Sequence, residues 1–177
     1  MGVGNVLLGD DALGPWMLRW MESRWQLPEG VTPFDAGTPG LDLTLFLDGF
    51  DAIVAVDAIA GSGAPGTVRT FRRADLLGRA LPIVMSPHEP TLREALMRLD
   101  LFGRCPTEVF LIGAVPERVT TGTGLSAAVR GAVPAIEAQI VRELERLGAR
   151  PVARAQPRPP DLWWEAPASA KLAPLPA

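Results

Sequence analysis

Hydrophobic positions along the chain alternate between short continuous runs and the three-to-four-residue spacing of amphipathic helices. Residues 52–56 (AIVAV) and 109–112 (VFLI) are short, continuous and apolar, which is typical of inner parallel strands that are buried on both faces. Directly after Asp11, apolar side chains recur with helical spacing and Pro15 falls in the first turn, so we expect a helix there. Its apolar positions are Leu13, Trp16, Met17, Trp20 and Met21.

Two further helices are expected downstream. One starts at Pro90 and Thr91, and the other begins near Ser126, where Gly131 and Pro134 are expected to kink or split it. The apolar stripe of the first of these two helices consists of Leu92, Ala95, Leu96 and Leu99. Strands that alternate with helices indicate an α/β domain. We therefore expect three layers, with a mostly parallel, twisted sheet flanked by helices on both faces.

The chain has 177 residues, of which 47% are hydrophobic, and a single domain of this length can bury a sizeable core. We expect that domain to span residues 1–150. From residue 151 onward the composition changes, because seven of the last 27 residues are proline and proline donates no backbone hydrogen bond. Residues 151–177 are therefore expected to form a flexible tail. Trp163 and Trp164 are the exception, since two adjacent indoles favour docking on the domain or on a partner.

Charge and cysteine content exclude several classes of protein. Cys105 is the single cysteine, so no intramolecular disulfide can form and a reducing compartment, by default the cytoplasm, is expected. The formal net charge is -3 and the arginines are scattered among acidic residues, which argues against a nucleic-acid partner. No window approaches the roughly 18 consecutive apolar residues of a membrane span, so neither membrane insertion nor secretion is expected.

Polar side chains follow three of the apolar stretches. His88, the only histidine, lies in the segment SPHEP just before a predicted helix, while Asp11 and Asp57 end GVGNVLLGDD and AIVAVD. Ligand sites in open parallel sheets lie outside the carboxyl ends of the strands, and two carboxylates with one imidazole can bind a metal that activates water or polarises a carbonyl. The glycines of DAGTPG, Gly37 and Gly40, would let a peptide approach closely. A hydrolytic metal site is therefore one interpretation.

An ordered set of motifs resembles the hydrogenase maturation endopeptidases. These motifs are GVGNVLLGDD, DAGTPG, AIVAVDAIAGSGAPG, SPHEPTLREAL, LIGAVPE and GLSAAVRGAVP, and they cover roughly residues 2–147. The resemblance implies a phosphorylase/hydrolase-like fold. It also implies a cytoplasmic metal-dependent endopeptidase that removes the C-terminal extension of a nickel–iron hydrogenase large-subunit precursor after nickel insertion.

The resemblance also implies roles for particular residues. Asp11, Asp57 and His88 match the family's metal-binding residues and would read the nickel that the precursor presents, so that neither a permanent metal nor a tightly bound organic cofactor is needed. Gly37, Thr38 and Gly40 match its substrate-contacting loop. The GVGN motif begins at Gly2, directly after Met1, so the first strand is expected to be missing or shortened, or to be supplied by residues 3–8.

Other interpretations of the same residues stay open. His88 could be a hydrogen-bonded structural residue, and Asp11 and Asp57 could cap a helix and a turn; Asp10 and Asp35 are expected to be solvated or capping residues. A serine hydrolase is disfavoured because no G-x-S-x-G motif surrounds Ser86, and the sequence around Cys105 does not indicate an activated thiol. The alternative functions are a non-catalytic protein that binds the precursor and a nucleotide-dependent enzyme, although GVGNVL has leucine in place of the last glycine of a dinucleotide fingerprint.

Overall fold

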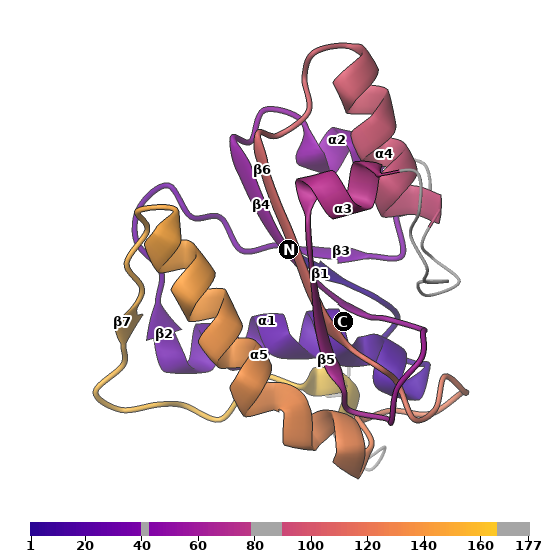
Figure 1. Ribbon diagram of the computed structural model, residues 1–177. Coiled ribbons are helices and arrows are strands. Elements are labelled where there is room, and N and C mark those ends of the chain that lie inside the picture. The colour runs from indigo at the N-terminus through magenta and orange to yellow at the C-terminus, as the bar shows by residue number, and fades with distance from the viewer. Residues whose placement is uncertain (40–42, 79–89, 166–177) are drawn as a thin grey trace, which may run out of the picture.

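The computed structural model describes residues 1–39, 43–78 and 90–165. Within them the central sheet has five strands in the order β3-β1-β4-β6-β5 (Figure 1). The parallel strands are β3 (Asp35–Gly37), β1 (Gly2–Val3), β4 (Ala52–Ala58) and β6 (Glu108–Ala114), and β5 (Val68–Arg72) is an antiparallel edge strand. The two predicted inner strands, β4 and β6, are confirmed.

Helices cover both faces of this sheet and so produce three layers (Figure 1). On one face lie α1 (Leu13–Arg24) and α5 (Ala127–Arg146), and on the other lie α2 (Leu43–Leu47), α3 (Arg73–Leu77) and α4 (Pro90–Leu101). Because side chains alternate along a strand, Val56 of β4 packs with α1 and α5, whereas Ile53 and Ala55 pack with α2 and α4. The three-layer, mostly parallel α/β fold expected from the sequence is confirmed.

The helix boundaries agree with the pattern of apolar residues, with one exception. The helices expected after Asp11 and at Pro90 begin at Leu13 and Pro90, and the Ser126 hydroxyl caps α5 by accepting from the Val129 N–H at 3.3 Å. The predicted split of α5 is wrong, since the helix runs unbroken through Pro134. Its apolar stripe is buried over the whole length of the helix, and this packing offsets the one backbone hydrogen bond that proline removes.

Close backbone contact fixes the start of α1 against the sheet. A Cβ atom on Gly14 would lie 2.2 Å from the carbonyl oxygen of Val3 and 2.5 Å from that of Val56, far inside van der Waals contact. Only glycine allows this approach. The turn that precedes α1 is therefore held directly at the carboxyl ends of β1 and β4.

The first strand is short, as expected, and of residues 3–8 only Val3 belongs to it. Strand β1 comprises only Gly2–Val3, with the Gly2 N–H donating to the Phe34 carbonyl at 3.0 Å. Gly4 then turns the chain away with a φ of 133°, a conformation that favours glycine.

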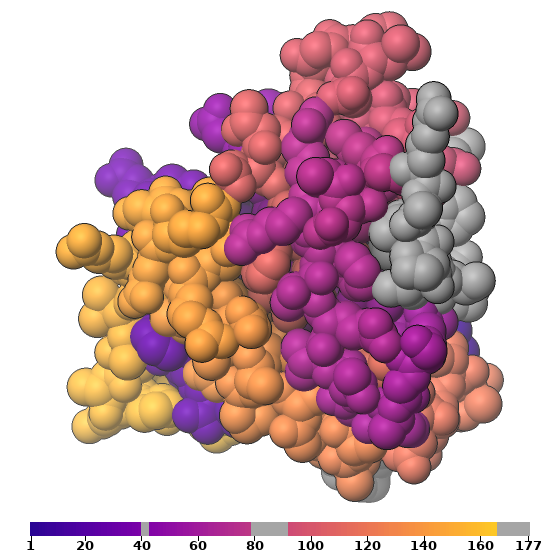
Figure 2. All heavy atoms as spheres, in the orientation of Figure 1, coloured from indigo at the N-terminus to yellow at the C-terminus, as the bar shows by residue number. Residues whose placement is uncertain are grey.

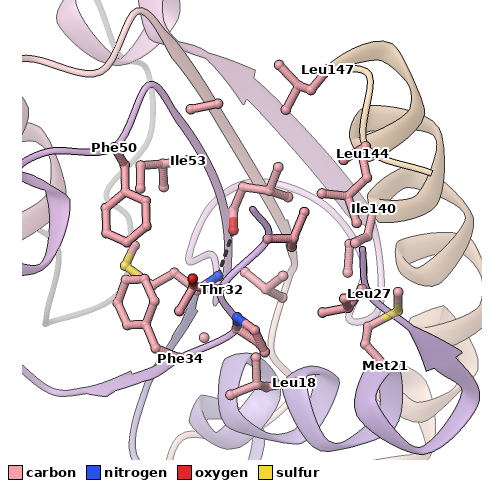
Figure 3. Close-up of a pocket in the computed structure, with 18 of the residues that line it drawn as sticks. Leu18, Met21, Leu27, Thr32, Phe34, Phe50, Ile53, Ile140, Leu144 and Leu147 are labelled. Carbon is pink, nitrogen blue, oxygen red and sulfur yellow. Dashed lines mark hydrogen bonds between the residues drawn. The ribbon is translucent and has the colours of Figure 1, made fainter. Parts of the chain in front are cut away.

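An apolar cavity of about 390 Å³ lies at the amino ends of β1 and β4, between Phe34 and Phe50 on one side and Ile140 and Leu144 of α5 on the other (Figure 3).

The described part of the expected tail is packed rather than detached. Strand β7 (Val152–Ala153) pairs with β2 (Trp25–Gln26), and Trp164 in η3 (Trp163–Glu165) is only 6% exposed. Figure 2 shows this yellow segment lying against α5 and parts of the indigo N-terminal region. The prediction of a flexible tail thus fails for residues 151–165, because prolines prevent regular hydrogen bonding without preventing apolar packing; residues 166–177 lie outside the described part of the chain.

Candidate functional site

The carboxyl edge of the parallel strands gathers four of the predicted site residues. The register pairs Gly2 with Val56 on β4, and Val3 with Gly37 on β3. Asp57 therefore follows on one side of the end of β1, and Gly37 and Thr38 lie on the other side. Asp11 belongs to η1 (Gly9–Ala12), which contacts β4. This convergence at one sheet edge agrees with the placement expected from the sequence.

Asp11 is held by the turn between β1 and η1. Its side chain is fully buried, and its Oδ2 accepts a hydrogen bond from the Asn5 backbone N–H at 2.9 Å. Gly4 packs so closely that a Cβ there would lie 1.8 Å from the Asp11 carbonyl oxygen. The N-cap residue of α1 is Ala12, which has no side-chain acceptor. The close backbone contacts thus fix the position of Asp11 beside the strand ends.

Asp57 occupies the next-to-last position of β4. The residue is 7% exposed, and its Oδ1 accepts from the Ala58 N–H at 2.7 Å. Alternation along β4 directs its side chain to the same face as Ile53 and Ala55, which is the face that α2 and α4 cover. The neighbouring strand approaches closely, since a Cβ on Gly113 would lie 2.2 Å from the Asp57 carbonyl oxygen.

The candidate substrate loop begins at the same edge. The Gly37 carbonyl accepts from the Gly4 N–H at 2.8 Å, and the Gly37 N–H donates to Asp35 Oδ1 at 2.8 Å. Gly37 has a φ of 55° with open space around it, and Thr38 is exposed. Asp35 is exposed and shapes this turn, so its interpretation as a solvated or capping residue is confirmed. Gly40 lies outside the described residues.

The third predicted metal ligand, His88, also lies outside the described residues. Helix α4 begins at Pro90, two residues further along the sequence, and covers the face to which Asp57 points. Across residues 1–39, 43–78 and 90–165, no group of three or more His, Cys, Asp and Glu side chains is arranged to hold a metal. The described part of the chain contributes carboxylate oxygens, which suit borderline divalent ions when an imidazole completes the set.

Asp10 is a second buried carboxylate beside Asp11. It is fully buried, so of the expected solvated or capping role the solvated one is wrong, and Asp10 accepts hydrogen bonds from backbone N–H groups instead. Its Oδ2 accepts from the backbone N–H groups of Glu117 and Arg118 at 2.8 and 3.0 Å, and its Oδ1 accepts from the Ser126 N–H at 2.6 Å. The pair of adjacent aspartates was the available signal, but the residues that satisfy Asp10 are more than 100 positions away in the sequence.

Features at the opposite end of the sheet do not contribute to this edge. Cys105 is half-buried and precedes β6 at the amino end of that strand, packed against the cluster beneath α4. The apolar cavity of Figure 3 also lies at the amino end.

No helix in the described ranges has the length and apolar character that a membrane crossing requires.

Comparisons with known proteins identify the family of this chain. The family model of the hydrogenase maturation proteases matches residues 17–143. The hydrogenase 2 maturation protease of Escherichia coli K12 is 32% identical over 156 residues, which cover 87% of this chain and 94% of that protein. The hydrogenase expression/formation protein HupD of Rhodobacter capsulatus is 34% identical over 149 residues, or 84% of this chain and 71% of HupD.

A solved structure extends the similarity to the fold. The hydrogenase maturating endopeptidase HybD from E. coli superimposes with a TM-score of 0.78 at 30% sequence identity, covering 87% of this chain and 95% of HybD. The similarity in three dimensions therefore extends over most of both chains.

Proposed function

Because the chain belongs to the hydrogenase maturation protease family, we propose that it removes the C-terminal extension of a nickel–iron hydrogenase large-subunit precursor after nickel insertion. The observation that carries this proposal is the convergence of Asp11 and Asp57 at the carboxyl edge of the sheet, beside the loop that starts at Gly37. We propose the cytoplasm as the place of action, because a protein whose only cysteine is unpaired suits a reducing compartment.

In this proposal the nickel ion arrives with the substrate. Asp11, Asp57 and His88 bind the ion that the precursor carries, and so place the neighbouring peptide segment at the sheet edge. The backbone around Gly37, Thr38 and Gly40 contacts that segment. The absence of a side chain at Gly37, with open space around it, lets an extended peptide approach the backbone closely.

The proposed reaction is metal-assisted hydrolysis of one peptide bond. The ion polarises the scissile carbonyl or a water molecule. The water oxygen then adds to the carbonyl carbon, the carbon–nitrogen bond breaks, and the new amino terminus leaves with a proton from the water. The buried Asp11 and Asp57 carboxylates hold the cation in place, because opposite charges attract more strongly where water is excluded.

The direct test is a cleavage assay on a purified precursor. Nickel-loaded and nickel-free precursor are each incubated with the wild-type protein and with His88→Ala, and release of the C-terminal peptide is followed by mass spectrometry. We expect rapid release only with wild-type protein and nickel-loaded precursor. Equal cleavage by wild type and His88→Ala would contradict the assignment of His88.

Two other functions predict different results in this assay. A non-catalytic binding protein would form a complex with the precursor without shortening it. A nucleotide-dependent enzyme would be stabilised by a nucleotide, but the turn after β1 argues against a phosphate site, because its amides are already paired. The Gly4 N–H donates to the Gly37 carbonyl, the Asn5 N–H to the Asp11 carboxylate, and the Gly9 N–H to the Gly122 carbonyl. A phosphate loop needs amides that are available to the ligand.

A further inference from the structure

Asp10 connects the turn that carries Asp11 to a distant loop. A buried carboxylate is stable only when it has partners, and Asp10 finds three backbone N–H groups at the two ends of the β6–α5 loop: Glu117 and Arg118 at the start, and Ser126 at the end. Hydrogen bonds to an ionised acceptor are stronger than those between neutral groups. One side chain therefore ties η1 to both ends of this loop.

Backbone hydrogen bonds reinforce the same connection. The Asp10 N–H donates to the Arg118 carbonyl at 3.1 Å and the Gly9 N–H donates to the Gly122 carbonyl at 2.8 Å. In return, the Gly122 N–H donates to the Leu7 carbonyl at 2.9 Å. The segment from Leu7 to Asp10 and the β6–α5 loop thus form one continuous hydrogen-bonded unit.

The geometry of η1 makes this unit relevant to Asp11. A 3₁₀ helix has three residues per turn, so adjacent side chains leave it in directions about 120° apart. Asp10 points to the β6–α5 loop, and Asp11 points toward Asn5 at the sheet edge. Fixing the direction of Asp10 therefore fixes the rotation of η1 about its axis, and with it the direction of the Asp11 carboxylate.

We propose that Asp10 is a positioning residue for the cleavage reaction, which orients Asp11 by bracing η1 against the β6–α5 loop. This inference rests on the proposed function. Helix α1 has its own anchors, since Leu13 and Met17 are fully buried and Gly14 is in close contact with β1 and β4. Loss of the Asp10 contacts should therefore act on η1 and its loop more than on the fold.

The first test is Asp10→Asn with Ser126→Ala as a matched control. The amide NH₂ of asparagine cannot accept a hydrogen bond, so at least one backbone N–H of the loop loses its acceptor whichever way the amide faces. Ser126→Ala removes the α5 cap but keeps the Ser126 backbone N–H that binds Asp10. At a temperature at which circular dichroism shows every protein folded, we expect kcat for Asp10→Asn to fall at least about tenfold, equivalent to about 1.4 kcal/mol, with KM little changed. Ser126→Ala should keep the wild-type kcat.

The second test loosens the same brace from the loop side. Gly122 has a φ of 147°, so Gly122→Ala strains the loop beside Gly9, whereas Gly103→Ala imposes a left-handed alanine after α4, far from η1. We expect a lowered kcat only for the first of these two variants. The comparison of Gly122→Ala with Gly103→Ala keeps the inference testable even if Asp10→Asn does not fold.

The outcomes separate the two proposals. If the wild-type protein does not shorten nickel-loaded precursor, the proposed function fails. If the wild-type protein cleaves, but Gly122→Ala matches Gly103→Ala and a folded Asp10→Asn matches Ser126→Ala in kcat, the positioning role of Asp10 is overturned.

Discussion

The packed C-terminal segment gives the most quantitative prediction for the fold. Trp164 is 6% exposed, whereas its neighbour Trp163 is 63% exposed. An indole buries about 150–250 Å², which at about 25 cal/mol per Å² corresponds to roughly 4–6 kcal/mol. The Trp164 Nε1 has no hydrogen-bond partner within the described residues, and this costs about 1–3 kcal/mol. We therefore expect Trp164→Ala to lower the free energy of unfolding by about 3 kcal/mol.

Trp163→Ala is the matched control, because it removes the same side chain from the adjacent, exposed position. Its expected cost is below about 1 kcal/mol, in proportion to the smaller buried area. Urea unfolding followed by far-ultraviolet circular dichroism measures both variants without relying on tryptophan fluorescence. The Tm of Trp164→Ala should fall by about 6–12 °C for a chain of this size. Equal stability of the two variants would mean that the segment does not dock through Trp164, and would refute the packing described above.

Two further predictions concern other contacts. Gly14→Ala should destabilise the protein by about 3 kcal/mol or prevent folding, because its Cβ would meet the Val3 backbone. Gly131→Ala lies in the open part of α5 and should instead stabilise the protein by about 0.5–1 kcal/mol. Thermal unfolding checks both variants, and equal changes in their Tm would contradict the close approach at Gly14. Burial of Glu143 acts to raise the pKa of its carboxyl, but hydrogen bonds from Arg72 and Arg146 outweigh it and hold the pKa below the usual 4.5. Glu143 therefore contributes stability above about pH 4.5 that disappears as the pH falls through its lowered pKa. The stability difference between wild type and Glu143→Gln should accordingly shrink as the pH is lowered below about 4.5, and a difference that grows there would show the opposite sign of the shift.

The sequence predicts those parts of the fold that depend on local patterns. Continuous apolar runs identify β4 and β6, and helical spacing identifies α1 and α4, because burial on two faces or on one stripe leaves a distinct period. The position of Asp57 at the end of β4 follows from the same pattern. The local pattern is therefore sufficient to locate the site at the carboxyl edge of the sheet.

The sequence does not predict features that depend on distant partners. The adjacent aspartates Asp10 and Asp11 have identical side chains, and the loop that satisfies Asp10 follows more than 100 residues later. The pattern alone cannot say that both are buried, or that Asp10 faces this loop while Asp11 faces Asn5 at the sheet edge. Similarly, the prolines after residue 150 indicate an irregular chain, but the surface on which Trp164 packs is built by other parts of the sequence.

The most direct measurement of the central claim compares two aspartates at opposite ends of one strand. Asp57→Asn alters the carboxyl end of β4, and Asp51→Asn alters an exposed residue just before its amino end. Release of the C-terminal peptide from nickel-loaded precursor is timed by mass spectrometry under single-turnover conditions. We predict that Asp57→Asn slows release about 100-fold, equivalent to about 2.7 kcal/mol, while Asp51→Asn leaves it unchanged. Equal rates for both variants would contradict a catalytic site at the carboxyl edge of the sheet.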